Sequence, residues 1–211
     1  TPGQANTPVG EVELCGGVSY EYSTEPVDYA QSYTWAVAPP AAGSFDGNGN
    51  EVVFQASGSW SGTFSIKVKA VNICGDGEWS ADLNCELFLS PEQFDLTGGG
   101  ELCEGDPGVE IGLMDSETGV SYELFNNNVS TGIIVAGTGE PISFGLINEE
   151  GNYTAIGSNG NCTIEMIGEM AVIVNYLPEQ LSMPDGATEV CNDAENEYST
   201  TGGEETDVIT W

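Results

Sequence analysis

An 88-residue internal period constrains this chain more than any other feature. Cys15, Cys103 and Cys191 stand at equal intervals of 88 residues, and Cys74 and Cys162 are separated by the same interval. A fixed period of this kind marks an array of similar structural units. We therefore expect two complete units and the opening of a third, within a longer protein.

Short segments that precede the units also recur. Pro91-Glu92-Gln93 and Pro178-Glu179-Gln180 share a Pro-Glu-Gln pattern, and Pro2-Gly3-Gln4 is similar. Because proline fixes φ and lacks an amide donor, it suits a boundary between strands of adjacent domains. Such short joints predict an extended string of domains. We place the domains at residues 1–90 and 91–177, with an incomplete repeat at 178–211.

Short runs that alternate apolar and polar residues predict β-strands in both units. The clearest run is 64–70, where Phe64, Ile66, Val68 and Ala70 would share one face. Long helical periodicity is absent from the sequence. About seven short strands in each unit are typical of an all-β fold of tandem immunoglobulin-like sandwiches. Further strands are expected at 18–22, 33–37, 52–54, 83–89, 122–124, 133–135, 142–144, 153–156 and 170–174.

The chain is strongly acidic: its formal net charge is −32, and Lys67 and Lys69 are its only basic side chains. Such a polyanion repels nucleic acid backbones and anionic lipid heads, so we expect neither as a partner. No apolar stretch approaches the roughly 18–20 residues needed to span a membrane, so no membrane insertion is expected. The acidity favours solubility in salty surroundings and leaves divalent cation binding open as a second interpretation.

Six cysteines in a regular array indicate an oxidising compartment. Their spacing does not fit zinc, because no Cys-x-x-Cys occurs and the chain has no histidine. The shared period favours disulfides within each unit, Cys15 with Cys74 and Cys103 with Cys162. Each would close a loop of about 60 residues and stabilise its unit by roughly 4 kcal/mol.

Two cysteines fall outside this scheme. Cys191 would need a partner beyond Trp211, and Cys85 has no counterpart one period later, where Ile173 stands. A bond between Cys15 and Cys85 stays open as an alternative, because the first and last strands of a sandwich can lie side by side.

The first unit carries Tyr33-Thr34-Trp35, Gly62-Thr63-Phe64-Ser65-Ile66 and Asn72-Ile73-Cys74-Gly75-Asp76-Gly77. With these segments it resembles the PKD-like, immunoglobulin-like repeats of very large surface proteins in Bacteroidetes. The second unit, with Gly151-Asn152-Tyr153-Thr154, looks like the companion repeat that alternates with them. The resemblance implies type IX secretion and a role as adhesin, gliding appendage or stalk of a secreted enzyme. Cys85 and the acidity depart from the usual pattern, and the acidity would suit a marine or salt-tolerant source.

Calcium is considered at two places, although no cofactor is expected to be required. The residues Asp46, Asn48 and Asn50 give the Asp-x-Asn-x-Asn start of a calcium loop. Glu51 then occupies the position of the required glycine, so a plain turn is favoured. At the first joint, carboxylates of two units would converge. The residues considered there are Glu92, Asp95, Glu101 and Glu104.

Trp60 and Trp79 fall in expected loops or strand ends, where exposed rings would stack on sugars. We favour a packing role, since large aromatic side chains are mostly buried. Trp35 is assigned to the core because it lies between Tyr33 and Val37 in an expected strand. No catalytic pair can be built on histidine and no two carboxylates stand out, so an enzyme is not expected.

These observations predict a structural and adhesive segment of a long extracellular surface protein, acting as a stalk, filament or appendage. Its partners would be the neighbouring repeats of the same chain. Several chains could also bundle into a fibre where salt or divalent ions neutralise the acidic surface. The alternative is a carbohydrate-binding or spacer module of a secreted enzyme.

Overall fold

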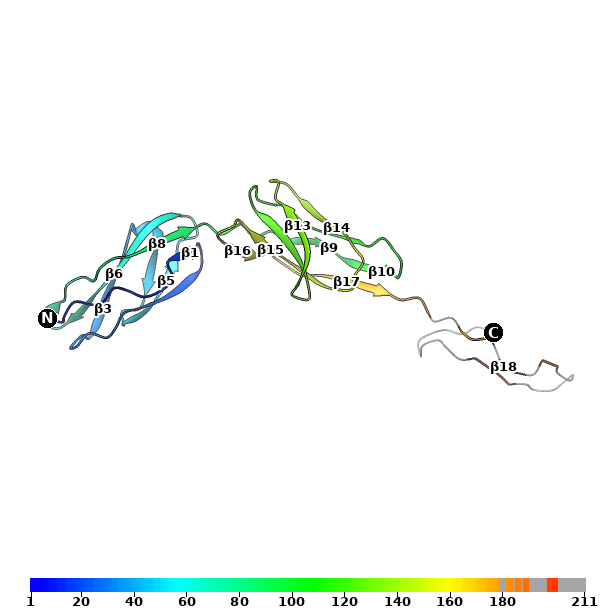
Figure 1. Ribbon diagram of the computed structural model, residues 1–211, viewed down its shortest axis with the longest axis horizontal. Coiled ribbons are helices and arrows are strands. Elements are labelled where there is room, and N and C mark those ends of the chain that lie inside the picture. The colour runs from blue at the N-terminus through cyan, green and yellow to red at the C-terminus, as the bar shows by residue number, and fades with distance from the viewer. Residues whose placement is uncertain (179–180, 184, 187, 190–196, 201–211) are drawn as a thin grey trace.

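The computed structural model of the 211-residue chain describes residues 1–178, 181–183, 185–186, 188–189 and 197–200. Two β-sandwiches follow one another along the chain (Figure 1), which confirms the predicted fold class. Beyond them, β18 (Asp185–Gly186) pairs with β19 (Tyr198–Ser199). Most of the predicted third repeat, with Cys191, lies outside the described residues. Within the described residues no helix is long and apolar enough to cross a membrane.

The first unit consists of two packed sheets. One sheet has the strand order β2-β5-β4, and the other has the order β1-β8-β6-β3 with β7 added beside β6. A 3₁₀ turn, η1 (Pro40–Ala42), connects β3 to β4. The strands are β1 (Glu13–Cys15), β2 (Ser19–Ser23), β3 (Ser32–Ala38), β4 (Gly43–Asp46), β5 (Glu51–Ala56), β6 (Gly62–Asn72), β7 (Gly75–Asp76) and β8 (Leu83–Phe88).

The core of the first unit is built from the inward residues of the two sheets. Every second side chain of β6 from Phe64 to Ala70 is buried, as its alternation predicts. Phe54 stacks on Phe64 with ring centroids 5.6 Å apart and meets Tyr22 edge-on at 6.0 Å. Trp35 is half-buried against the core, and its Nε1 donates a hydrogen bond to the Gly49 carbonyl. Burying each such ring stabilises the fold by roughly 1.5–3 kcal/mol.

The second unit repeats this plan with one difference. One sheet has the order β14-β11-β9, and the other has the order β10-β17-β15-β12-β13 with β16 beside β15. Tyr122, Leu124 and Tyr153 are fully buried at its centre. The strands are β9 (Leu96–Gly98), β10 (Gly100–Cys103), β11 (Val109–Leu113), β12 (Ser121–Asn126), β13 (Val129–Ala136), β14 (Ile142–Ile147), β15 (Gly151–Ser158), β16 (Thr163–Glu165) and β17 (Met170–Asn175).

The difference concerns β4 of the first unit and β13 of the second, and local sequence explains it. Asn127 and Asn128 have φ values of 47° and 65°, which are the left-handed values of a two-residue hairpin turn. This turn returns β13 beside β12. In the first unit, Pro39 and Pro40 end β3 because proline cannot donate to a strand ladder, and β4 pairs with β5 in the opposite sheet.

In both units the strand that ends in a cysteine runs parallel to the last strand, β1 to β8 and β10 to β17. Cys15 lies opposite Phe88 in the pair β1–β8, and Cys103 lies opposite Asn175 in the pair β10–β17. This register shifts the last strand by one residue relative to the 88-residue period. Cys85 is therefore equivalent to the buried Val172, and the expected alignment with Ile173 is wrong.

The Cys85 thiol lies in the core of the first unit beside a buried hydroxyl. Its sulfur is 4.0 Å from the Tyr22 hydroxyl, which donates a hydrogen bond of 2.5 Å to the Glu11 carbonyl. Burial raises the pKa of the Cys85 thiol and of the Tyr22 hydroxyl, because a charged form would lose its solvation. Burial therefore favours the neutral form of both groups in the folded unit.

Gly10 gives a first prediction. A Cβ at this position would lie 2.3 Å from the ring of Tyr22. We expect Gly10→Ala to destabilise the first unit by roughly 1–3 kcal/mol, as overpacking does. Urea unfolding followed by tryptophan fluorescence measures this, because Trp35, Trp60 and Trp79 lie in the first unit and the second has none.

Gly58→Ala is the matched control, since its Cβ would have no neighbour nearer than 3.8 Å. Its unfolding midpoint should stay close to wild type, within about 0.5 kcal/mol. Equal destabilisation by both substitutions would contradict the contact between Gly10 and Tyr22.

The buried thiol gives a second prediction. The unfolded chain loses the Cys85 proton near the ordinary pKa of 9.0, whereas the folded unit loses it only at higher pH, because burial raises the pKa of the thiol. The free energy of unfolding is therefore not reduced by ionisation of Cys85 below pH 9.0, and it declines as the pH rises above that value. We expect Cys85→Val, which copies Val172 of the second unit, to flatten the alkaline decline in urea-unfolding free energy. An unchanged slope above pH 9.0 would contradict the assignment.

Candidate functional site: a disulfide-linked joint

A disulfide connects the two sandwiches across their joint. It joins Cys15, the last residue of β1, to Cys162, which lies in the turn between β15 and β16. The two Cα atoms are 5.7 Å apart, within the usual range for a disulfide. The first unit is therefore held to the second by this bond as well as by the peptide chain.

The predicted pairing of Cys15 with Cys74 and of Cys103 with Cys162 is wrong, and strand direction explains why. β6 runs antiparallel to β8, so Cys74 lies at the end of the sandwich opposite Cys15. An 11-residue strand spans roughly 35 Å, far beyond the reach of a disulfide. In the second unit, Cys103 and Cys162 are separated in the same way.

The alternative bond between Cys15 and Cys85 does not form either. β1 and β8 do lie side by side, as that alternative assumed, but Cys85 points into the core. In the part of the chain that the structure describes, Cys74, Cys85 and Cys103 are free thiols, and the first and last of these are exposed.

Asn159 supplies a second contact across the joint. Its Nδ2 donates a hydrogen bond of 2.8 Å to the Leu89 carbonyl of the first unit. Its Oδ1 accepts a hydrogen bond of 2.9 Å from the backbone N–H of Cys162. One side chain therefore holds the linker and shapes the turn that carries the cysteine.

The linker itself is fixed at both ends. Ser90 Oγ donates to the Gly16 carbonyl in the first unit, and Gln93 Nε2 donates to the Glu165 carbonyl in the second. Pro91 is buried between these points. Because a peptide linker and a disulfide both cross the joint, rotation of one unit against the other is restricted.

The disulfide also encloses most of both units. Its cysteines are 147 residues apart, so the chain-entropy account gives a stabilisation of about 5 kcal/mol against unfolding of both units together. Neither Cys15 nor Cys162 belongs to a buried core cluster of either unit. Its effect on the fold therefore comes through the connection of the units.

The Asp46–Asn50 segment is a hairpin loop between β4 and β5. The carbonyls of Asn48, Gly49 and Asn50 accept hydrogen bonds from Tyr33, Trp35 and Thr24, respectively. These carbonyls hold the loop against neighbouring strands, which supports the interpretation of a turn.

The joint carboxylates do not gather at one place. Glu92 is in the linker, and Asp95 pairs with Ile167. Glu101 lies opposite Ile173 in β10, while the N–H of Glu104 bonds to Asn175 at the far end of the second unit. The expectation that all four lie near the first joint is wrong, because the chain runs the length of the sandwich between them. Among the described residues, no three acidic or cysteine side chains form a metal-binding group.

The two tryptophans considered for sugar stacking are partly buried. Trp60 packs against the core and meets Phe64 edge-on, with centroids 6.3 Å apart. The ammonium groups of Lys67 and Lys69 lie 5.1 and 4.8 Å from the ring centroid of Trp79. Lys69 also forms an ion pair with Asp76. Both lysines of the chain therefore cover Trp79, an arrangement that stabilises the ring by cation–π attraction.

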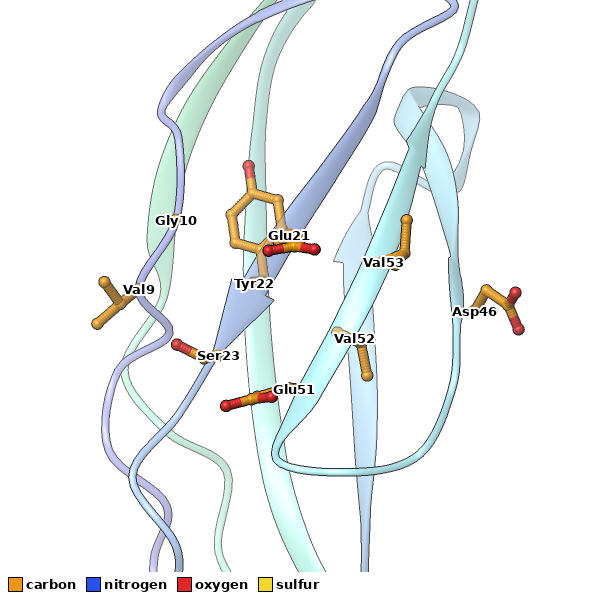
Figure 2. A pocket seen from close by; sticks show the side chains of 9 residues that line it. All are labelled: Val9, Gly10, Glu21, Tyr22, Ser23, Asp46, Glu51, Val52 and Val53. Atoms are coloured by element: carbon orange, nitrogen blue, oxygen red, sulfur yellow. The ribbon is translucent and has the colours of Figure 1, made fainter.

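A hollow of about 550 Å³ lies beside β2 and β5 in the first unit (Figure 2). Its lining includes the carboxylates of Glu21, Glu51 and Asp46. Figure 2 shows the Glu51 carboxylate on the Val9 side of β5 and Asp46 on the other side. No basic side chain lines the hollow, so an anionic ligand would be repelled.

The sequence pattern missed two functional features, the cross-joint pairing and the role of Asn159. The period could not reveal the pairing, because Cys15 with Cys74 and Cys15 with Cys162 both preserve it. The sequence Asn159-Gly160-Asn161-Cys162 does carry a turn signal, since Asn side chains commonly bond to nearby backbone amides.

Comparison with known proteins agrees with the fold of the first unit. A family model described as PKD-like domain matches residues 1–85. The match spans most of the first unit and less than half of the chain. No curated protein matches the chain.

Three solved structures are similar in outline. Murine CEACAM1b is 12% identical, with 80% of this chain and the whole of that chain covered and a TM-score of 0.36. The chicken CNTN1 FN1-FN3 domains are 12% identical, with 97% and 77% covered and a TM-score of 0.35. The fibronectin(III)-like modules of Clostridium thermocellum CbhA are 11% identical, with 81% and 93% covered and a TM-score of 0.31. These TM-scores are too low to support any inference about function.

The joint gives a third prediction, about disulfide connectivity. Cleavage after glutamate without reduction should release residues 14–21, which hold Cys15, linked to residues 151–165, which hold Cys162. Mass spectrometry before and after reduction identifies the pair. A link from residues 14–21 to residues 52–78 or 79–86, which hold Cys74 and Cys85, would contradict the cross-joint bond.

Proposed function

We propose that the chain is a load-bearing segment of a long extracellular surface protein, in which PKD-like and immunoglobulin-like units form a stalk or filament for attachment. The observation that carries the proposal is the disulfide between Cys15 and Cys162. A covalent bond between neighbouring units, outside both cores, has its main effect on how the units transmit force.

Strand order in each sandwich supports this role. The first strand, β1, is parallel to the last strand, β8, and the second unit has the same arrangement in β10 and β17. When the disulfide is reduced, pulling the two ends of such a unit apart slides the paired strands along each other. All hydrogen bonds of the pair then bear load together, whereas peeling would break them one at a time.

The disulfide gives force a second path. Tension from the second unit reaches Cys15 directly through Cys162, so it does not have to pass through the core of the first unit. The residues between the two cysteines cannot be pulled straight while the bond is intact. A stalk built this way keeps its length under tension even when a unit opens.

Surface chemistry supports a structural role over a catalytic one. The hollow of the first unit is lined by carboxylates. The hydroxyl of Tyr22, which also lines it, donates a hydrogen bond to the Glu11 carbonyl. A net charge of −32 keeps such chains apart at low salt. Export into an oxidising, extracellular compartment is the setting in which the disulfide would form and persist. We extend the proposal to the surface proteins of Bacteroidetes, on the sequence resemblance of both units.

Force spectroscopy on the chain held at its two ends gives the fourth prediction. The cysteines of the disulfide are 147 residues apart, and at about 3.5 Å per residue they enclose roughly 50 nm of chain. We expect the double variant Cys15→Ser/Cys162→Ser to extend by roughly 50 nm more than the oxidised protein when both units unfold. Reduction of the wild-type protein should give the same gain.

The control is Cys85→Val, which leaves the disulfide in place and should extend like the wild type. The proposal fails if the oxidised protein extends by the full length of both units, because Cys15 and Cys162 would then not be joined when load is applied.

A further inference from the structure

The free thiols of Cys74 and Cys103 occupy the same structural positions as the two cysteines of the disulfide. Cys103 ends β10 as Cys15 ends β1. In each case the residue after the cysteine donates its N–H to a carbonyl of the last strand. Gly16 donates to the Phe88 carbonyl at 2.8 Å, and Glu104 donates to the Asn175 carbonyl at 2.9 Å. The backbone that presents Cys103 is therefore built like the backbone that presents Cys15.

Cys74 corresponds to Cys162 in the same detail. Each is the residue immediately before the short return strand, β7 in the first unit and β16 in the second. Each backbone N–H is bonded at 2.9 Å to an asparagine side chain, Asn72 for Cys74 and Asn159 for Cys162. The turn is two residues longer in the second unit, but it ends at the cysteine in both.

These cysteines lie at opposite ends of the two-unit segment. Cys74 follows β6 at the end near the N-terminus, and Cys103 ends β10 at the far end of the second unit (Figure 1). Both side chains are exposed, whereas Cys162 is 1% exposed inside the joint. Each outer end of the segment thus carries one half of the pair that is joined at the internal joint.

The outer end beside Cys74 also carries exposed apolar side chains. Ile73 is 86% exposed and Tyr29 is 88% exposed. The two residues belong to neighbouring loops, because Asn72 Nδ2 donates to the Tyr29 carbonyl and the N–H of Ile73 bonds to Gln31. An apolar surface at the end of an otherwise acidic sandwich fits contact with the end of another unit.

We propose that Cys74 and Cys103 each form a disulfide with an adjoining unit of this type, equivalent to the bond between Cys15 and Cys162. One disulfide would then cross every joint of the array. Cys74 would bond to the cysteine of the preceding unit that is equivalent to Cys15. Cys103 would bond to the cysteine of the following unit that is equivalent to Cys162. The proposal rests on the array proposed above. Its independent support is the disulfide between Cys15 and Cys162, which shows the two cysteine positions joined when two units meet end to end.

The bond requires an oxidant, and thiol–disulfide exchange supplies it. One thiolate attacks a glutathione disulfide or the disulfide of an oxidoreductase and releases one thiol. The second thiolate then attacks the mixed disulfide and releases the other thiol. Two protein thiols become one disulfide, and one small disulfide becomes two thiols.

Two copies of this chain provide the test, because Cys103 of one copy can meet Cys74 of another. The background is Cys85→Val/Cys191→Ser, which removes the other two cysteines that lie outside the known disulfide. One protein carries Cys74→Ser in addition, and the other carries Cys103→Ser. Each is incubated alone and in an equal mixture, in a buffer of reduced and oxidised glutathione.

We expect a disulfide-linked dimer in the mixture and no such dimer when either protein is incubated alone. Non-reducing electrophoresis measures the dimer, and cleavage after glutamate should yield residues 52–78 linked to residues 102–104. The parent protein with both cysteines should give a ladder of longer linear species.

Two outcomes would overturn the proposal: no dimer in the mixture, or dimers of each single variant as abundant as the mixed one. The second result would mean exposed thiols reacting without the end-to-end fit. Because this experiment applies no load, its failure would leave the force-spectroscopy result for Cys15 and Cys162 untouched, and the two proposals can fail separately.

Discussion

The parallel pairing of β1 with β8, and of β10 with β17, is the constraint on which the joint depends. It brings the end of β1 to the end of the unit where the chain leaves at Phe88. The antiparallel strand β6 carries the turn cysteine to the opposite end. Any two such units placed end to end therefore bring unlike cysteines face to face, and the bond between Cys15 and Cys162 is the result.

Much of the fold was predictable from the sequence because its longer strands alternate. The strand 64–70 has a clear physical signal in the residues themselves, because its apolar side chains fall at every second position. β1, β7 and β16 have only two or three residues each, which is too short for a period to appear. In β11, Ile111, Gly112 and Leu113 are all buried in succession, so no alternation marks it.

The joint was less predictable, because spacing along the chain contains no information on strand direction. An 88-residue period is satisfied equally by a bond within a unit and by a bond to the next unit. The choice depends on which end of the sandwich each cysteine reaches, and that is set by β1, β6 and β8 together. The exposed thiols Cys74 and Cys103 follow from the same directions.

The span of the disulfide has a consequence for damage to the chain. Proteases of the extracellular medium cut exposed loops, and a single cut normally separates the parts on either side. Here a cut anywhere between Cys15 and Cys162 leaves both fragments joined through sulfur. A surface protein built from such units would stay in one piece after a nick in almost any loop of these two domains.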